Sequence, residues 1–150
     1  MDIAPFRPVD AGELLTLQRA AFVTEAQLYG DPRLPALVET IEELIAAVQR
    51  GPALVARTGS RAVGSVRTRI EDGVLHVGRL VVAPDLQGRG IGSRLLSASE
   101  AATGLPRATL FTGARSLANL RLYRRHGYVE NRREMLRPGV ELVHLVKELA

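Results

Sequence analysis

The strongest constraint on the fold is an apolar run that passes directly into a glycine-rich loop and then into a helix-like segment. Residues 74–82 form the most apolar strand-like run of the chain, as expected of a central strand. Gly88, Gly90 and Gly92 follow, and residues 91–102 have the apolar positions of an amphipathic helix. This order predicts either an anion-binding turn or a turn shaped for tight packing.

The rest of the chain predicts a mixed arrangement of strands and helices. Capping patterns at 10–13 and 40–43 begin two helices, and a third is expected over 117–125, where Ser116 could act as the cap. Residues 23–39 are expected to form a loop with a short helical turn. Further strands are expected over 3–9, 53–57, 62–70, 108–111, 128–136 and 140–149.

Several of these strands are joined as hairpins, and only some steps are of βαβ type. We therefore predict an α/β domain of the mixed α+β type. It contains one mixed, mostly antiparallel sheet of six to seven strands, flanked on both faces by about four helices.

Length and composition favour a single domain over residues 1–150. The chain has 150 residues and a hydrophobic share of 46%, enough for one core. No apolar run approaches the roughly 20 residues that cross a bilayer, and the N-terminus lacks the order of a signal peptide. Because the chain has no cysteine, thiolate metal sites are excluded. We expect a cytoplasmic protein with no metal and no membrane partner.

Positive charge is concentrated after the first third of the chain. The formal net charge is +4, made up of −4 over residues 1–50 and +8 over residues 51–150. A basic region suits nucleic acid, a polyphosphorylated cofactor or simply a solvated surface. Aromatic residues make up only 4% of the chain and are not interleaved with basic ones, so we expect no nucleic-acid partner.

The glycine loop has the chemistry of a pyrophosphate site. Glycines allow positive φ, and the free N–H groups and dipole of a helix start favour an anion. Arg89 and Arg94 could add charged contacts. A dinucleotide fingerprint would need Gly or Ala where Ser93 stands, and the Gly-Lys-Ser/Thr of a Walker loop is absent.

Residues 80–96 closely resemble the central motif of the GCN5-related N-acetyltransferase (GNAT) superfamily. That motif is a hydrophobic strand, a Val-x-Pro step, Gln/Arg-x-x-Gly-x-Gly/Ala and an amphipathic helix. The resemblance implies a single GNAT-like domain with splayed central strands, in which the loop holds the pyrophosphate of acetyl-CoA. The cofactor-binding residues that it implies are Leu80, Val81, Val82, Gln87, Gly88, Arg89, Gly90, Ile91, Gly92 and Ser93.

A second match to the family covers residues 116–128. Asn119 and Tyr123 are one helical turn apart and share a face. The resemblance implies that Asn119 contacts the coenzyme A arm and that the hydroxyl of Tyr123 protonates the departing thiolate. A phenol suits that role because its pKa of about 10 keeps it protonated at neutral pH. The alternative is a core tyrosine with a satisfied hydroxyl.

The general base is less determined. Against one family pattern, the position of a glutamate base falls on His76, and histidine near its ordinary pKa is a competent base. The alternative is a strand histidine that bonds a neighbour. Another common position for an acid falls on Arg79 instead, and Glu25 and Tyr29 are weaker candidates for lining the acceptor pocket.

The charge pattern leaves the acceptor open. If the acidic residues 1–50 line the acceptor cleft, they favour a cationic amine. Arg67, Arg69 and Arg79 favour an acceptor with a carboxylate instead. An amino-acid-like or polyamine acceptor is compatible with both readings.

These observations predict an N-acetyltransferase that passes the acetyl group of acetyl-CoA directly to the primary amine of a small molecule. Without a cysteine, a thiol-acyl enzyme is excluded. The alternative is a non-catalytic module on the same fold that senses acyl-CoA or binds a partner. Because enzymes of this kind often dimerise, a homodimer also stays open.

Overall fold

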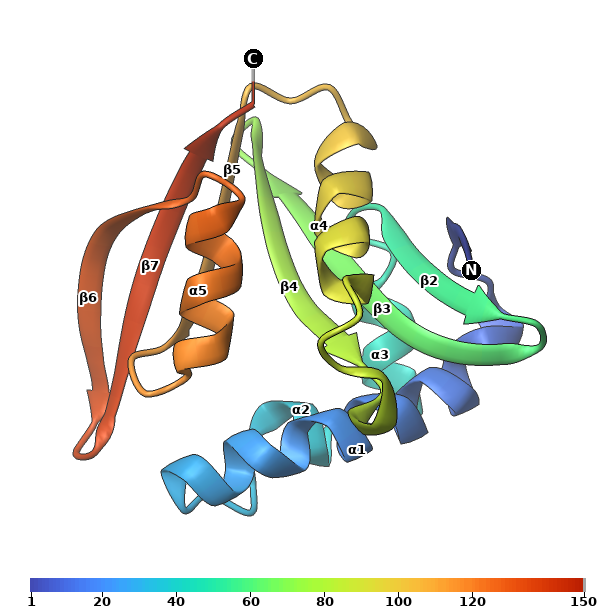
Figure 1. Cartoon of the computed structure of the whole chain (residues 1–150), viewed down its shortest axis with the longest axis horizontal. Helices are drawn as coiled ribbons and strands as arrows, with labels where there is room; N and C mark the ends of the chain where they lie inside the picture. Colours follow the sequence, from blue (N-terminus) through green and yellow to red (C-terminus); the bar gives the residue numbers. More distant parts are fainter. Residues whose placement is uncertain (150) are drawn as a thin grey trace.

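The computed structural model describes residues 1–149, which fold around a seven-stranded sheet (Figure 1). The strands are β1 (Asp2–Pro5), β2 (Ala53–Thr58), β3 (Arg61–Glu71), β4 (Val74–Val82), β5 (Arg107–Gly113), β6 (Val129–Arg137) and β7 (Val140–Glu148). Their order across the sheet is β1-β2-β3-β4-β5-β7-β6. Within the described strands β4 and β5 are parallel and all other neighbours are antiparallel. The predicted mixed, mostly antiparallel sheet is confirmed.

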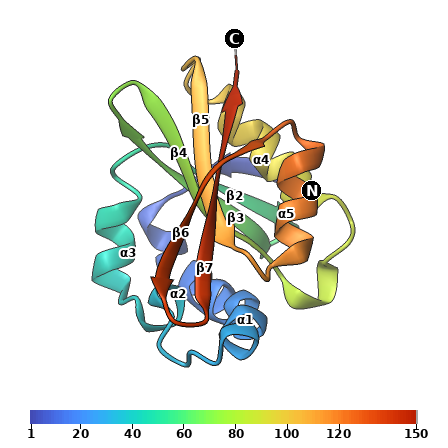
Figure 2. The same ribbon diagram turned by 90° about the vertical axis from the view of Figure 1, so that its left-hand side faces the viewer.

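Helices cover both faces of the sheet, as predicted (Figures 1 and 2). They are α1 (Ala11–Tyr29), α2 (Pro35–Val38), α3 (Ile41–Ala47), α4 (Ile91–Ala101) and α5 (Leu117–Arg125), with 3-10 turns η1 (Pro8–Asp10) and η2 (Pro84–Leu86). Helices α4 and α5 contribute to the main hydrophobic core on one face, whereas α1 packs with Val55 and Val81 on the other. Within residues 1–149, no helix is long and apolar enough to span a bilayer.

The first strand is shorter than predicted. It ends at Pro5 instead of Val9 because the chain turns into η1, where the N–H of Arg7 donates to the carboxylate of Asp10 at 2.8 Å. Asp10 therefore closes the turn before α1 and does not cap α1 with its side chain.

The first helix is longer than predicted, so the loop expected over residues 23–39 is wrong for residues 23–29. Helix α1 continues to Tyr29 and ends at Gly30, which has a left-handed φ of 61°. The hydroxyl of Tyr29 holds this end against Gly113 of β5, where an added Cβ would lie only 1.8 Å from the tyrosine oxygen. Tyr29 and Gly113 are far apart in the sequence, so no local pattern predicts this contact. The short helical turn expected in the remaining loop is α2.

The two central strands β4 and β5 separate after a short pairing, which confirms the expected splay. Only Leu75 with Ala108 and His76 with Thr109 are paired between them in the described structure. Beyond His76 the strands diverge toward α1 (Figure 1). The sheet therefore opens into a gap at its centre.

A bulge at Arg79 changes which face β4 presents. The register against β3 shifts there, and Arg79 has a φ of 47°, unusual for a residue with a side chain. Before the bulge, Leu75 and Val77 enter the core under α4 and α5. After it, Val81 enters the core under α1. The bulge thus lies where the gap opens, and it turns the end of β4 toward α1.

Candidate active site

A cleft of about 700 Å³ lies between the end of β4 and α5, on the side of β4 that β5 leaves open. Four kinds of element contribute to it: the end of β4, the glycine loop with the start of α4, one face of α5 and the second half of α1. The lining residues include Phe22, Glu25, Leu80, Val81, Val82, Gln87, Gly88, Gly90, Ile91, Gly92, Ser93, Asn119, Arg121 and Arg125. Most of the residues that the sequence assigned to a cofactor are thus brought together in one place.

The glycine loop presents an open helix start to this cleft. Gly88 and Gly90 have φ values of 78° and 81°, so both positions need glycine for an unstrained backbone. Gly90 is the N-cap of α4, and no side chain caps the helix there. The first N–H groups of α4 are therefore available to an anion, with the positive end of the helix dipole behind them.

The arginines nearest the cleft come mainly from α5. Arg121 and Arg125 lie one helical turn apart and both line it. Arg89 and Arg94, which the sequence favoured, instead border a neighbouring depression together with Arg61. Arg121 was not predicted from the sequence, although its spacing of four residues from Arg125 on one helix was a usable signal.

Two backbone N–H groups of β4 point into the gap. The N–H of Ala83 donates to Val63 of β3 at 2.9 Å, and successive residues of a strand point their N–H groups to opposite edges. The N–H of Val82, and that of Leu80 two residues earlier, therefore face the side on which β5 has moved away. Such groups can bind amide oxygens of an extended ligand or an oxygen that gains negative charge.

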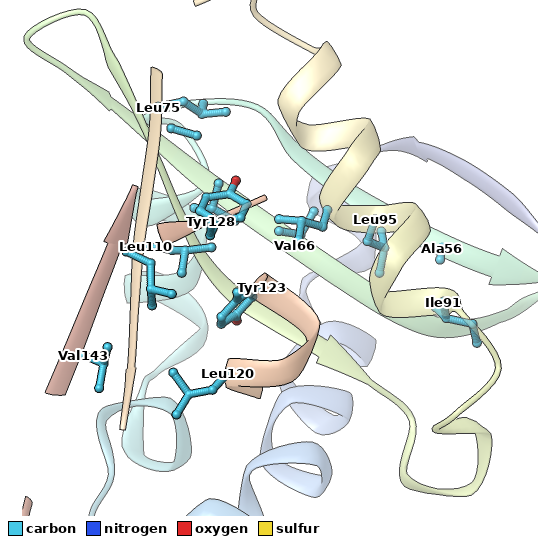
Figure 3. Close-up of a cluster of buried hydrophobic side chains, with 14 of the residues drawn as sticks. Ala56, Val66, Leu75, Ile91, Leu95, Leu110, Leu120, Tyr123, Tyr128 and Val143 are labelled. Carbon is cyan, nitrogen blue, oxygen red and sulfur yellow. The ribbon is translucent and has the colours of Figure 1, made fainter. Parts of the chain in front are cut away.

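Asn119 and Tyr123 both lie on α5, but only Asn119 lines the cleft. The side-chain amide of Asn119 donates to the hydroxyl of Thr112 at 3.2 Å, which fixes a side chain that lines the cleft. Tyr123 lies deeper, within the main core and 6.1 Å from the ring of Tyr128 in an edge-on arrangement (Figure 3). The tyrosine is therefore a core residue whichever chemical role it has.

The two buried tyrosines differ in the groups around their hydroxyls. Burial, and then the negative charge of Glu25, raise the pKa of Tyr123 to about 12. The hydroxyl of Tyr128 is engaged, because it donates to Glu100 at 2.8 Å. No hydrogen bond contributes to the pKa of Tyr123, so its proton is uncommitted and stays on the phenol at neutral pH.

Glu25 is held at the cleft by a chain of hydrogen bonds. Ser116 donates its hydroxyl proton to Glu25 at 2.6 Å, and so it accepts from Tyr29 at 2.8 Å. The backbone N–H of Arg115 in turn donates to the Tyr29 hydroxyl at 3.1 Å. Ser116 was expected to cap α5 with its side chain. It is the N-cap residue, but its hydroxyl bonds Glu25 and makes no capping hydrogen bond to the helix. Glu25 was expected in a loop and instead lies on α1, near Tyr123.

His76 lies outside this cleft, in a second cavity of about 520 Å³ that also contains Gly78 and Arg79. Its Nδ1 is 3.1 Å from Nη2 of Arg69. Arginine can only donate, so Nδ1 accepts and the neutral ring carries its proton on Nε2. Burial, and then the charge of Arg69, lower the pKa of His76, so the ring is neutral at pH 7. Arg69 must release Nδ1 before His76 can accept a proton there.

A family profile agrees with this geometry. The profile described as "Acetyltransferase (GNAT) domain" matches residues 49–130, more than half of the chain. No curated protein sequence matches the chain.

Solved structures share the fold over almost the whole chain. The ribosomal-protein-S18-alanine N-acetyltransferase of Escherichia coli has a TM-score of 0.82 at 14% identity, covering 99% of this chain and 94% of that one. The PaiA N-acetyltransferase of Thermoplasma acidophilum, solved in complex with coenzyme A, has a TM-score of 0.78 at 18% identity and covers 96% and 98%. YncA of Salmonella typhimurium, solved with acetyl-CoA, has a TM-score of 0.78 at 19% identity and covers 100% and 94%.

Proposed function

The chain belongs to the GNAT family of N-acetyltransferases, and from this premise we propose that it transfers the acetyl group of acetyl-CoA directly to the primary amine of a small acceptor. The observation that carries the proposal is the cleft between the end of β4 and α5. It joins an uncapped helix start, two inward N–H groups and the side chains of Asn119 and Arg121. The coenzyme supplies an activated acetyl thioester when it is bound.

Different residues of the cleft suit different parts of the coenzyme. The N–H groups at Gly90–Gly92 suit the pyrophosphate, and Arg121 and Arg125 can neutralise its charge. A Cβ added at Gly92, in the first turn of α4, would lie 3.6 Å from Leu122 and 3.7 Å from Val82, in ordinary van der Waals contact with both. Asn119 and the end of β4 suit the amide-bearing arm.

Three groups can act on the reaction itself. The N–H groups of Leu80 and Val82 are oriented to stabilise the carbonyl oxygen of the acetyl group as charge builds on it. The hydroxyl of Tyr123 holds a proton for the sulfur that leaves. We assign the proton of the attacking amine to His76 once Arg69 has moved away. Glu25, whose charge acts on Tyr123, is the alternative acceptor of that proton.

The direct test is release of coenzyme A thiol from acetyl-CoA in the presence of a panel of primary amines. The chain has no cysteine, so the protein adds no thiol signal of its own. The expected result is amine-dependent thiol release. Binding of coenzyme A without transfer to any amine would identify the non-catalytic module instead.

A pair of glycine variants tests the binding cleft. Gly90 and Gly104 flank α4, both have positive φ, and neither has a neighbour within 4 Å of an added Cβ. Alanine is therefore strained at both positions, but only Gly90 faces the cleft. We expect Gly90→Ala to weaken acetyl-CoA binding about tenfold or more in calorimetry, and Gly104→Ala to leave it unchanged. If both variants bind acetyl-CoA equally well, the pyrophosphate does not bind at this loop.

A further inference from the structure

The second cavity continues the same strand that borders the acetyl-CoA cleft. His76, Gly78 and Arg79 of β4 line the cavity, and the next residues, Leu80 to Val82, line the cleft. Consecutive residues of a strand are only about 3.3 Å apart along its axis. A small molecule in this cavity is therefore next to the place where the acetyl group would lie.

The cavity is strongly cationic. Its lining contains no Asp or Glu but two histidines and five arginines, which come from separate elements: Arg50, Arg67, Arg69, Arg79 and Arg132. Neighbouring acids neutralise only part of this charge. Arg67 binds Glu39 with both nitrogens, at 2.6 and 2.9 Å, and Arg69 binds Glu71 at 2.7 Å.

Among these arginines, Arg79 has a charge that neighbouring groups balance only weakly. Its Nε is buried without a hydrogen-bond partner, the one such side-chain atom within residues 1–149. The nearest carboxylate, Glu39, is 3.9 Å away and is already engaged by Arg67. Burial, followed by the charge of Arg67, lowers the pKa of Arg79. Two guanidinium groups thus share one carboxylate, which leaves room for a second anion.

We propose that this cavity is the acceptor site and that the acceptor is a small amino acid, whose carboxylate binds at Arg79 and whose amine reaches the acetyl group. The inference rests on the proposed acetyl transfer and specifies its substrate class. The same charges oppose a polyamine, because each additional ammonium would enter a field of like sign. They also lower the pKa of the acceptor ammonium, which supplies the neutral amine that attacks the carbonyl carbon. The amine nitrogen gains the acetyl group and loses a proton, and the sulfur leaves as a thiol.

The experiment compares acceptors that differ only in charge. Glycine, β-alanine and 4-aminobutyrate are each assayed beside their primary amides, and 1,4-diaminobutane represents the polyamines. We expect kcat/KM to be at least tenfold higher for the best acid than for its own amide, with the diamine lowest. A diamine or an amide as the best acceptor would overturn the inference. So would activity on acidic peptides with none on free amino acids.

Arginine variants locate the effect. Arg79→Gln should raise KM for the amino acid at least tenfold and abolish the preference for acid over amide, without changing acetyl-CoA binding in calorimetry. Arg50→Gln offers a variant at the exposed rim of the same cavity and should reduce the same preference without endangering the fold. Arg107→Gln, on β5 but paired with Glu148, is the matched control. It should change neither KM for the amino acid nor the preference for acid over amide.

The two proposals fail differently. Without thiol release from any amine in the panel, the acetyltransferase assignment itself fails. Release with amides and diamines, but no advantage for acids and no effect of Arg79→Gln, removes only the carboxylate site. Loss of acetyl-CoA binding in Arg79→Gln would show a structural role for the side chain and contradict its assignment to the acceptor.

Discussion

Tyr123 combines a place in the hydrophobic core with an unbonded hydroxyl, and this combination makes its chemical role testable. We expect Tyr123→Phe to lower kcat about a hundredfold, within the range typical of a lost general acid. Acetyl-CoA binding should stay within twofold, because the ring keeps its packing. Steady-state rates and calorimetry measure the two effects.

Tyr128 provides the matched control for this prediction. It lies in the same core, but its hydroxyl donates to Glu100. Tyr128→Phe should reduce stability by roughly 1–3 kcal/mol, the cost of losing a hydrogen bond to a charged group, and leave kcat unchanged. Equal kcat values for both variants and the original chain would remove Tyr123 from the reaction.

His76 stays a prediction as the general base, and its pKa gives the test. Burial and Arg69 both lower that pKa below 6.5, so an acid limb that belongs to His76 should lie below pH 6.5 in a kcat profile. Arg69→Gln removes one of the two causes and should move the limb upward. His76→Gln should abolish it. A limb that neither substitution changes belongs to another group, and Glu25 is then the next candidate.

At the scale of elements, the packing of α4 on β3 depends on a glycine. A Cβ at Gly64 would lie 2.9 Å from both Leu95 Cδ1 and the carbonyl oxygen of Val81. We expect Gly64→Ala to lower the free energy of unfolding by about 1–3 kcal/mol through overpacking. Urea denaturation measures the change. Gly78→Ala, on the neighbouring strand with no atom within 4 Å of its Cβ, should change it by less than about 1 kcal/mol.

The elements that the sequence predicted well are those with local causes. The positive φ of Gly88 and Gly90 is a local requirement for glycine, and the shared face of Asn119 and Tyr123 follows from helical spacing. The turns and strands between residues 53 and 82 likewise follow from residues a few positions apart.

The features that the sequence did not reveal depend on distant contacts. Helix α1 continues past Phe22 because Tyr29 reaches Gly113, more than eighty positions away in the chain. Glu25 and Ser116, which share a hydrogen bond, are 91 positions apart. The cationic cavity also contains arginines from several separate elements. In the sequence, Arg67, Arg69 and Arg79 indicated an acceptor with a carboxylate, but their positions in the chain did not show that they share a cavity.

At the scale of the whole molecule, the acidic first third of the chain forms ion pairs with arginines of the basic remainder. Asp10 and Glu13 bind Arg57, Asp31 binds Arg137, and Glu39 binds Arg67. Four of the eight acids in residues 1–50 are therefore engaged in ion pairs. None of the eight lines the cationic cavity, so their charge gives no reason to expect a cationic acceptor there.

These ion pairs predict how stability depends on pH. The pKa values of these four carboxyl groups are lowered: for Asp10, burial alone would raise the value, but the bonds from Arg7 and Arg57 outweigh it. A lowered pKa in the folded state means that the stabilisation is complete above the ordinary values of 3.8 and 4.5 and is lost as pH falls through the lower ones. Urea midpoints should thus be constant from pH 7 to about 5 and fall below about pH 4. Asp10→Asn should lower the midpoint at pH 7 and flatten the fall, and a constant midpoint down to pH 3 would contradict the prediction.

The splay of β4 from β5 also determines how the backbone exchanges hydrogen with solvent. The N–H of Ala83 is bonded to β3, whereas strand alternation turns those of Leu80 and Val82 toward the gap, beyond the short pairing of β4 with β5. Along one strand, slow and fast amide exchange should therefore alternate from one residue to the next. Acetyl-CoA would remove this alternation by occupying the edge that β5 leaves open, so the ligand would complete the hydrogen bonding of the sheet at its centre.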